Sequence, residues 1–298
     1  MTTQGRPAVC VSYLAAAELW SVPKFPAPNH GAEILTTEES IAADGPMTAA
    51  VLAALDVPTL LVANRIGNDD VGGRVGRWLQ QHHVPSTAVV SADVVTPKIV
   101  VVADGRDTRT WFAYLPEVTD ELSRCDLSPI GTASMVYLDA YQLIEAAVIR
   151  VVRAARDCGT ELLVNLGGSP LSDALRLELS GYQNLIIQTN VDDESRSGVP
   201  AAQQAHLLGR DLEDPRGASV ILHRGSAHDQ AHGSRLGDLP FHGRPLAQET
   251  VAQWLKLTQS AIRWSAWSLS AGMVTVPCLP APPTRSVHDC AGKQLRWR

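Results

Sequence analysis

Short apolar runs recur along the first two thirds of the chain, and polar or mixed segments separate them. Runs of four to eight apolar residues are typical of strands that are buried on both sides of a sheet. The runs that predict such strands are 8–14, 58–63, 135–138, 161–165, 184–188 and 219–222. The sequence therefore predicts a sheet that is covered on both faces.

Between these runs, apolar residues return every three or four positions. Segment 71–82 has this helical spacing, and 47–55 is predicted to be helical because it is rich in alanine. Segment 146–158 is also a predicted helix, and Gly159 is a natural residue to end it. Strands that alternate with helices are typical of parallel sheets with right-handed crossovers. We therefore predict an α/β fold with a doubly wound, mainly parallel sheet.

One stretch breaks this alternation. Residues 98–103 and 109–115 are rich in β-branched and aromatic residues, and Asp104-Gly105 between them favours a hairpin turn. Residues 32–41 also have strand and turn character. We predict a small antiparallel sheet, built from segments of about 12–42 and 96–115, that stands off the main one.

The pattern weakens after residue 223. Segment 248–267 has helical character, but 277–283 contains four prolines, and we expect 277–298 to be an irregular tail. Histidines at 223, 228, 232 and 242 could surround a zinc ion if this segment folded back. Histidines of a glycine-rich surface loop are the more common case, so we predict no metal site.

Composition narrows the classes of function. The 298 residues suit one large domain over 1–298; 45% are hydrophobic, and the net charge is −6. No basic stripe predicts nucleic-acid binding, and no apolar run is long enough for a membrane span, so we expect a cytoplasmic protein. The five cysteines show no disulfide pattern, and we expect Cys10 and Cys158 to be buried.

Four motifs carry a resemblance to a known family. They are Ile66-Gly-Asn-Asp-Asp-Val-Gly72, the hairpin with Thr96, Asp104-Gly105 and Arg109-Thr110, the acidic segment Asn190-Val-Asp-Asp193-Glu194, and Val220-Ile-Leu-His223-Arg-Gly225. Over residues 8–225 the sequence resembles the ribokinase-like (PfkB) sugar kinases. Asp69 and Asp70 could equally cap the helix that follows them, and Asn190–Glu194 could be an ordinary acidic loop.

The resemblance implies a small-molecule kinase that transfers phosphate from ATP to a hydroxyl of a sugar or nucleoside. It implies substrate contacts from Asp44, Gly45, Thr96 and Asn165, between the main sheet and a lid formed by the small sheet. It implies that Asn190, Asp193, Glu194, His223 and Gly225 bind ATP, with Mg²⁺ organised by the acidic residues. It also implies a homodimer through the lid.

The sequence departs from the family where phosphate transfer would occur. The family's Gly-Ala-Gly-Asp string, which supplies an anion hole and a catalytic base, does not occur here. The best placement puts Ser265 and Ala266 at the anion hole and Trp267 at the base, and an indole cannot accept the proton. The substrate block Asp44-Gly45 lacks the family's Asn, and Asn165 replaces an Asp. The catalytic residues are therefore unknown.

Three hypotheses follow. The first is that the chain is an active sugar or nucleoside kinase with another base. The second is that it keeps the fold without this chemistry, as a small-molecule binder, a regulatory pseudokinase or an enzyme of another class that uses the sugar pocket. The third is that residues from about 223 onward come from a shifted reading frame, which the coding DNA would reveal.

Overall fold

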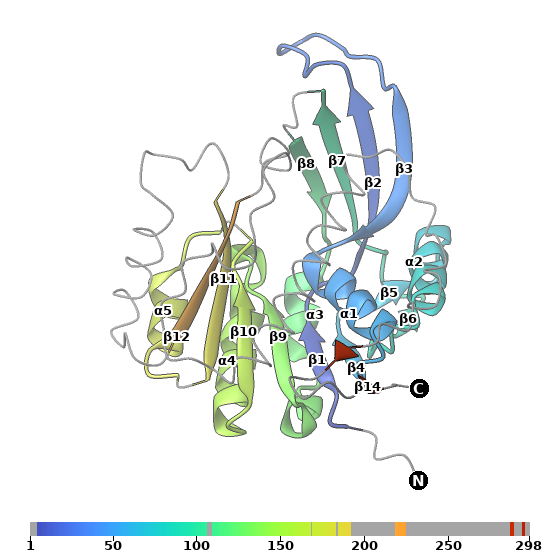
Figure 1. Ribbon diagram of the computed structural model, residues 1–298. Coiled ribbons are helices and arrows are strands. Elements are labelled where there is room, and N and C mark those ends of the chain that lie inside the picture. The colour runs from blue at the N-terminus through green and yellow to red at the C-terminus, as the bar shows by residue number, and fades with distance from the viewer. Residues whose placement is uncertain are drawn as a thin grey trace.

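The main sheet of the computed structural model has six strands, all parallel, in the order β12-β11-β10-β9-β1-β4 (Figure 1). The structure describes residues 5–105, 109–167, 169–182, 184–191, 218–224, 287–288 and 294–295. The strands are β1 (Ala8–Val11), β4 (Thr59–Val62), β9 (Met135–Asp139), β10 (Glu161–Asn165), β11 (Leu185–Val191) and β12 (Ala218–Arg224). The predicted parallel sheet is confirmed.

Helices cover both faces of this sheet, as the continuous apolar strands predicted. One face packs on α1 (Asp44–Ala54) and α2 (Asp70–Gln81). The other packs on α3 (Val118–Arg124), α4 (Glu145–Asp157) and α5 (Asp173–Leu179). Side chains alternate along each strand: Cys10, Tyr137 and Leu163 lie in the α1 core, while their neighbours Val9, Val136 and Leu162 lie in the α4 core.

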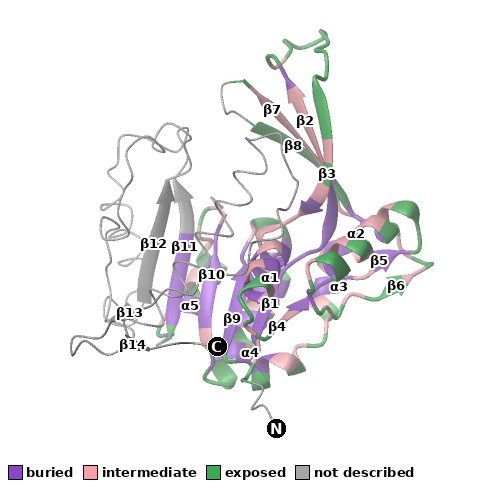
Figure 2. Ribbon diagram, turned by 45° about the vertical axis from the view of Figure 1, so that its right-hand side comes forward, coloured by how far each residue is buried: buried purple, intermediate pink, exposed green. Residues whose placement is uncertain are grey.

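A second sheet of four strands projects from the main body (Figure 1). Its order is β3-β2-β7-β8, with β2 (Ala15–Val22), β3 (Thr36–Ala42), β7 (Lys98–Asp104) and β8 (Arg109–Tyr114). The sheet that we predicted is present, but it is mixed rather than antiparallel throughout, because β2 and β7 pair in parallel. The chain leaves the main body along both β2 and β7 and returns along β3 and β8, so the two outgoing strands run the same way. All of β8 is exposed (Figure 2).

Several elements differ from the sequence prediction. The helix predicted over 47–55 begins at Asp44, three residues earlier, and β2, α3 and α5 were not predicted as separate elements. Cys10 is buried as predicted, but Cys158 is exposed, because it lies in the C-terminal cap of α4. Gly159 follows it with a left-handed φ of 62°, as a helix-ending glycine should.

The remaining elements are short. They are two 3₁₀ turns, η1 (Ser128–Thr132) and η2 (Gln142–Ile144), the parallel pair β5 (Ile66–Gly67) and β6 (Val90–Ser91), and the antiparallel pair β13 (Val287–His288) and β14 (Gln294–Leu295). The last pair lies in the segment that we predicted to be irregular.

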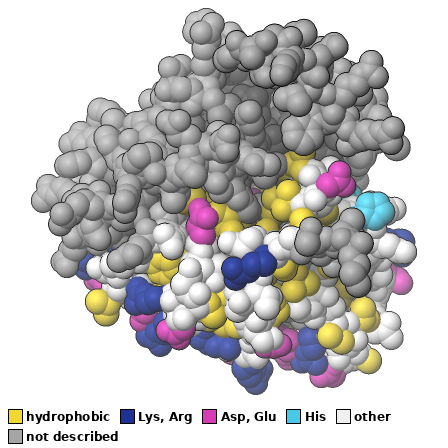
Figure 3. All heavy atoms as spheres, turned by 60° about the horizontal axis from the view of Figure 1, so that its bottom comes forward, with side chains coloured by type: hydrophobic (Ala, Val, Ile, Leu, Met, Phe, Trp, Pro, Cys, Tyr) yellow, Lys and Arg dark blue, Asp and Glu magenta, His cyan; other side chains and the backbone are white. Residues whose placement is uncertain are grey.

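Charges of both signs are interspersed over the described part of the face in Figure 3, which shows no large field of one sign. Within the described residues, no helix combines the length and the hydrophobicity that a membrane crossing requires.

Candidate functional site

A row of polar side chains crosses the main sheet where its strands end. Asp139, Asn165 and Gln188 are in-register neighbours on β9, β10 and β11, and Ser12 directly follows β1. Each comes two residues after a member of the α1 core, namely Cys10, Tyr137, Leu163 and Ile186. Because side chains alternate along a strand, all four members of this polar row face the α1 side.

Asp139 is the centre of hydrogen bonding in this row, and it is fully buried. Its Oδ2 accepts from the hydroxyl of Ser12 and from the backbone N–H of Gly45, both at 2.6 Å. Its Oδ1 accepts from the hydroxyl of Tyr137 and from the amide of Asn165, both at 3.1 Å. These donors come from four segments that are far apart in the sequence, so the carboxylate ties the strand ends to the start of α1.

Gly45 makes this contact because it has no side chain. A Cβ at this position would lie 2.3 Å from Cβ of Ser12 and 3.0 Å from Oδ2 of Asp139. The first turn of α1 can therefore rest directly on the strand ends and point an otherwise unpaired N–H at the carboxylate. The positive end of the helix dipole also favours a negative charge there.

Asn165 joins Asp139 to a second carboxylate. Its Nδ2 lies 2.8 Å from Oδ2 of Asp44 and 3.1 Å from Oδ1 of Asp139. Its Oδ1 accepts from the N–H of Gly167 at 3.1 Å, which fixes the orientation of the amide because an NH₂ group could not accept. The hydroxyl of Tyr141 also donates to Oδ2 of Asp44, at 2.7 Å. We call Ser12, Asp44, Gly45, Asp139 and Asn165 the strand-end cluster.

The electrostatics of the strand-end cluster keep a proton near Asp139. Burial, followed by the negative charge of Asp44, raises the pKa of Asp139 to about 7, although the hydrogen bonds from Ser12, Gly45 and Asn165 oppose this shift. Burial likewise raises the pKa of Tyr137 and Tyr141 well above the ordinary range, with Asp139 as the next cause. The two phenols are therefore neutral donors at neutral pH.

Gln188 extends the polar row but has no partner. The residue is 2% exposed, and neither its amide oxygen nor its amide nitrogen has a hydrogen-bond partner within the described part of the chain. Buried amides are nearly always paired, because an unpaired one loses its bonds to water without replacement. The row therefore contains hydrogen-bonding atoms that the described residues leave unpaired.

The structure brings together three of the four residues predicted to contact substrate: Asp44, Gly45 and Asn165. Thr96 lies elsewhere, where its Oγ1 is 2.7 Å from Oδ1 of Asp69 and accepts from the N–H of Gly67 at 2.8 Å. Asp69 caps α2 by accepting from the N–H of Gly72, which confirms the capping interpretation of that motif.

The nucleotide side of the prediction lies mostly outside the described residues. Asp193, Glu194, Gly225, Ser265, Ala266 and Trp267 fall outside them, as do His228, His232 and His242. Asn190 and His223 are described by their backbone, as register partners on β11 and β12. Within the described residues, no group of three His, Cys, Asp or Glu side chains could hold a metal ion.

Sequence reasoning missed Ser12, Asp139, Tyr137 and Tyr141. Asp139 did leave a signal, because it is the charged residue that ends the buried run Met135–Leu138. A charged residue at the carboxyl end of a buried parallel strand is a natural site candidate, because ligands of open α/β sheets bind at that edge.

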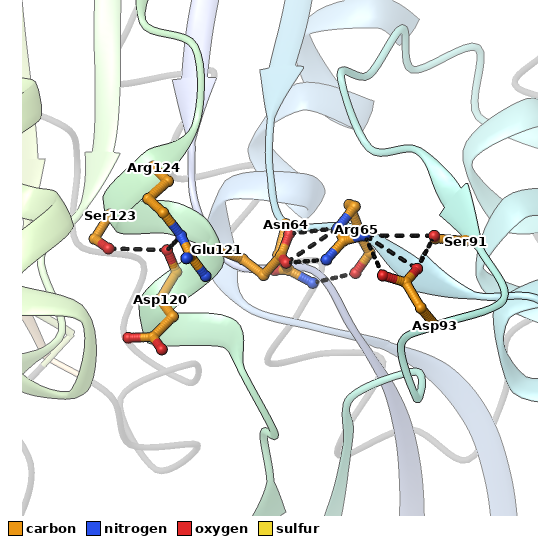
Figure 4. Close-up of polar contacts among 8 residues, drawn as sticks. All are labelled: Asn64, Arg65, Ser91, Asp93, Asp120, Glu121, Ser123 and Arg124. Atoms are coloured by element: carbon orange, nitrogen blue, oxygen red, sulfur yellow. Dashed lines mark hydrogen bonds and ion pairs between the residues drawn. The ribbon is translucent and has the colours of Figure 1, made fainter.

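A second cluster of charged side chains lies beside α3 (Figure 4). It borders a pocket of about 390 Å³. Arg65 pairs with Glu121, with 2.6 Å between Nη2 and Oε1, and with Asp93, with 3.0 Å between Nη1 and Oδ2. Ser91 donates to Asp93 as well. We call Arg65, Ser91, Asp93 and Glu121 the Arg65 network. The guanidinium of Arg65 lowers the pKa of Glu121. At Asp93 the hydrogen bond from Ser91 is the largest cause of a lowered pKa, and Arg65 is the next.

Comparison with known proteins identifies the fold. No protein-family model matches the sequence, and no curated protein matches it. Among solved structures, ribokinase of Arabidopsis thaliana complexed with ribose and ATP is 18% identical, with a TM-score of 0.56, over 90% of this chain and 87% of that one. Fructokinase of Xylella fastidiosa with bound ATP is 13% identical, with a TM-score of 0.56, over 89% of this chain and 86% of that one.

Ribokinase of Giardia lamblia is also similar, with 12% identity and a TM-score of 0.56 over 74% of this chain and 71% of that one. At such low identity, these matches show a shared fold. They confirm the α/β architecture of a parallel main sheet and a projecting second sheet that the sequence resemblance predicted.

Proposed function

We propose that this chain, whose fold is ribokinase-like, binds a sugar or nucleoside at the carboxyl ends of β1, β9 and β10 and phosphorylates one of its hydroxyls with ATP. The observation that supports binding is the strand-end cluster, in which Asp44, Asp139 and Asn165 share one hydrogen-bonded network. Carboxylates and amides held at fixed positions are suited to hydroxyl recognition. The edge at which they lie is where open α/β sheets bind ligands.

Within this site, the two carboxylates have different tasks. Asp44 is only partly buried, and within the described residues it accepts hydrogen bonds at one oxygen, so its other oxygen can accept from a substrate hydroxyl. Asp139 is fully buried and holds the N–H of Gly45 and the amide of Asn165 in place. Asp139 therefore acts as a positioning residue for Asp44.

The proposed reaction forms a bond between a substrate hydroxyl oxygen and the terminal phosphorus of ATP, breaks the bond from that phosphorus to ADP, and releases the hydroxyl proton to a base. ATP would supply the phosphoryl group near Asn190 and Gly225, as the sequence resemblance implies. The sequence resemblance assigns Mg²⁺ to the acidic residues Asp193 and Glu194, which lie outside the described residues.

A second candidate function is binding without phosphorylation. The observation that favours it is the sequence itself, which has no Gly-Ala-Gly-Asp string. The resemblance places Trp267 at the position of the base. In this case the strand-end cluster would still recognise a hydroxylated ligand, and ATP would not be hydrolysed in its presence.

Two measurements on the full-length chain separate these candidates. Calorimetric binding of a panel of sugars and nucleosides tests the site, and ADP release with the same panel tests transfer. Asp44→Asn should weaken binding about tenfold or more through loss of a charged acceptor, whereas Asp173→Asn, at a side chain that is 93% exposed, should not. Binding with ADP release supports the kinase, and binding without it supports the second candidate. If no compound binds, the proposed site is wrong.

We also propose a homodimer through the second sheet, as the resemblance implies. Its edge strand β8 exposes Trp111 by 62% and Phe112 by 65%, a large apolar surface for an edge strand. Light scattering after size-exclusion chromatography should give twice the mass of the chain, and Trp111→Lys should give the monomer mass.

A further inference from the structure

We infer that the ligand of the strand-end cluster carries a positively charged amine, and that Asp44 binds this group next to the buried carboxyl of Asp139. This inference rests on the proposed binding function and names the class of ligand: an amino sugar or another hydroxylated amine. Three features of the structure lead to it.

The first is uncompensated negative charge. One amide nitrogen, Nδ2 of Asn165, lies within 3.1 Å of both Asp44 and Asp139, so the two carboxylates are close neighbours. The five ion pairs of the described residues involve neither of them. The hydrogen-bond donors that reach them from the described residues are all neutral. A partly buried carboxylate beside a fully buried carboxyl is unfavourable when both are charged and the described residues bring no cation to them. A cationic ligand would remove that cost.

The second is the unpaired amide of Gln188. It lies beside Asn165 in register and on the same face of the sheet, so it points into the same layer as the carboxylates. Both of its polar atoms lack partners within the described residues, although 98% of the residue surface is covered, since its exposure is 2%. Among the described residues, the polar row therefore has unused hydrogen-bonding atoms beside the cluster, which a polar ligand would pair.

The third is an aromatic pair at the edge of the cluster. The rings of Tyr13 and Tyr141 lie 5.8 Å apart and are tilted by 54°. The hydroxyl of Tyr141 lies 2.7 Å from Oδ2 of Asp44. Burial raises the pKa of both phenols, and the charges of Asp139 and Asp44 are the next causes. Carboxylates combined with neutral aromatic rings are a favourable environment for an ammonium group.

The test uses matched triplets of ligands on the full-length chain. Each triplet contains an aminodeoxy sugar, the parent sugar with a hydroxyl in place of the amine, and the N-acetyl derivative, for a set of hexoses and pentoses. Calorimetry is done at a pH at which the amine is protonated. We expect one amine to bind at least about tenfold more tightly than its parent and its N-acetyl derivative, as charged hydrogen bonds would give.

Two further readouts locate the selectivity. Asp44→Asn should reduce the preference for the amine about tenfold or more, and Asp173→Asn should leave it intact. The second readout uses the wild-type chain, so it remains available if the variant misfolds. The bound amine should displace the proton that the carboxylate pair retains at neutral pH. Binding enthalpies in two buffers with different ionisation enthalpies would then differ.

The outcomes distinguish this inference from the proposed function. Equal binding of amine and parent, or a preference that survives Asp44→Asn, would overturn the inference and leave hydroxyl binding intact. Absence of proton release with a tightly bound amine would also overturn it. If none of the three members binds in any triplet, the proposed function fails and this inference fails with it.

Discussion

Two regions of the molecule place a pair of carboxylates around one nitrogen-bearing side chain, and they differ in how the charge is compensated. In the Arg65 network a guanidinium lies between Asp93 and Glu121. In the strand-end cluster the neutral amide of Asn165 lies between Asp44 and Asp139. The pKa shifts have opposite signs: those of Asp93 and Glu121 are lowered, and that of Asp139 is raised to about 7.

This difference separates a structural contact from the site at which we propose that a ligand binds. Arg65 connects α3 to the segment before β7 and satisfies its own partners, so the network needs nothing further. Among the described residues, the strand-end cluster has no cation and continues to Gln188, whose amide has no partner there. The pocket of about 390 Å³ lies at the Arg65 network, yet the chemistry that calls for a ligand lies at the strand ends.

The largest effect on the strand-end cluster should come from Asn165→Asp. A third carboxylate would replace the only amide that donates to both others, so we expect the free energy of unfolding at pH 8 to fall by about 3–5 kcal/mol. Urea denaturation would measure this change. Asn184→Asp, at an exposed position, is the control and should change stability by less than about 0.5 kcal/mol. Equal effects of the two variants would contradict the described geometry.

Gly45→Ala should have the next largest effect. The added Cβ would meet Ser12 at 2.3 Å and push the first turn of α1 away from Asp139, so we expect a loss of about 2–3 kcal/mol and weaker ligand binding. Gly76→Ala is the matched control, because it lies within α2 and its Cβ would meet nothing within 4 Å. That variant should gain about 0.5–1 kcal/mol from helix propensity. A loss at both positions would show that the contact at Gly45 is not specific.

The two regions also show what the sequence can predict. Helix α2 and its Asp69 cap depend on residues that are close together in the chain, and both were predicted. Asp139 and Ser12 are separated by 127 positions, and only the pairing of β1 with β9 brings them together. The predicted strand stopped at Leu138, one residue before the aspartate, because the pattern ends where the apolar residues end.

Two other differences have similar causes. The strand β2 begins with three alanines, which have little strand propensity, and its pairing with β3 and β7 determines its structure. The helix predicted over 47–55 begins earlier, at Asp44, because its first turn tolerates the proline at position 46. The substrate role of Thr96 stays a prediction, because the structure shows only its bonds around Asp69.

The pH dependence of stability tests the sign of the Asp139 shift. Its pKa is about 7 in the folded state and about 3.9 in the unfolded chain, so between these values the folded state binds the extra proton. This contribution to stability is therefore present at low pH and is lost as the pH rises through about 7. The tyrosines that face Asp139, Tyr137 and Tyr141, stay neutral over this range, as does Cys10.

We therefore expect the stability of wild type relative to Asp139→Asn to fall by up to about 1.4 kcal/mol per pH unit between about pH 4 and 7. Urea denaturation at five pH values would give the free energy of unfolding of both proteins against pH. The substitution itself changes stability by a pH-independent amount, which does not affect the slopes that are compared. Parallel curves would mean that Asp139 titrates normally and that the strand-end cluster does not retain a proton.

The smallest effect should come from Arg65→Gln. Because Arg65 is partly exposed and its partner Asp93 is largely exposed, solvent and salt screen these ion pairs. We expect a lower Tm at low ionic strength, a smaller loss at about 0.5 M salt, and unchanged ligand affinity and amine preference. Arg124→Gln, at an exposed arginine beside the same pocket that donates to the carbonyl of Asp120, is the control and should change the Tm less. If Arg65→Gln abolished the preference for an amine, the two regions would be coupled, and the separation of the structural Arg65 network from the binding site at the strand ends would be wrong.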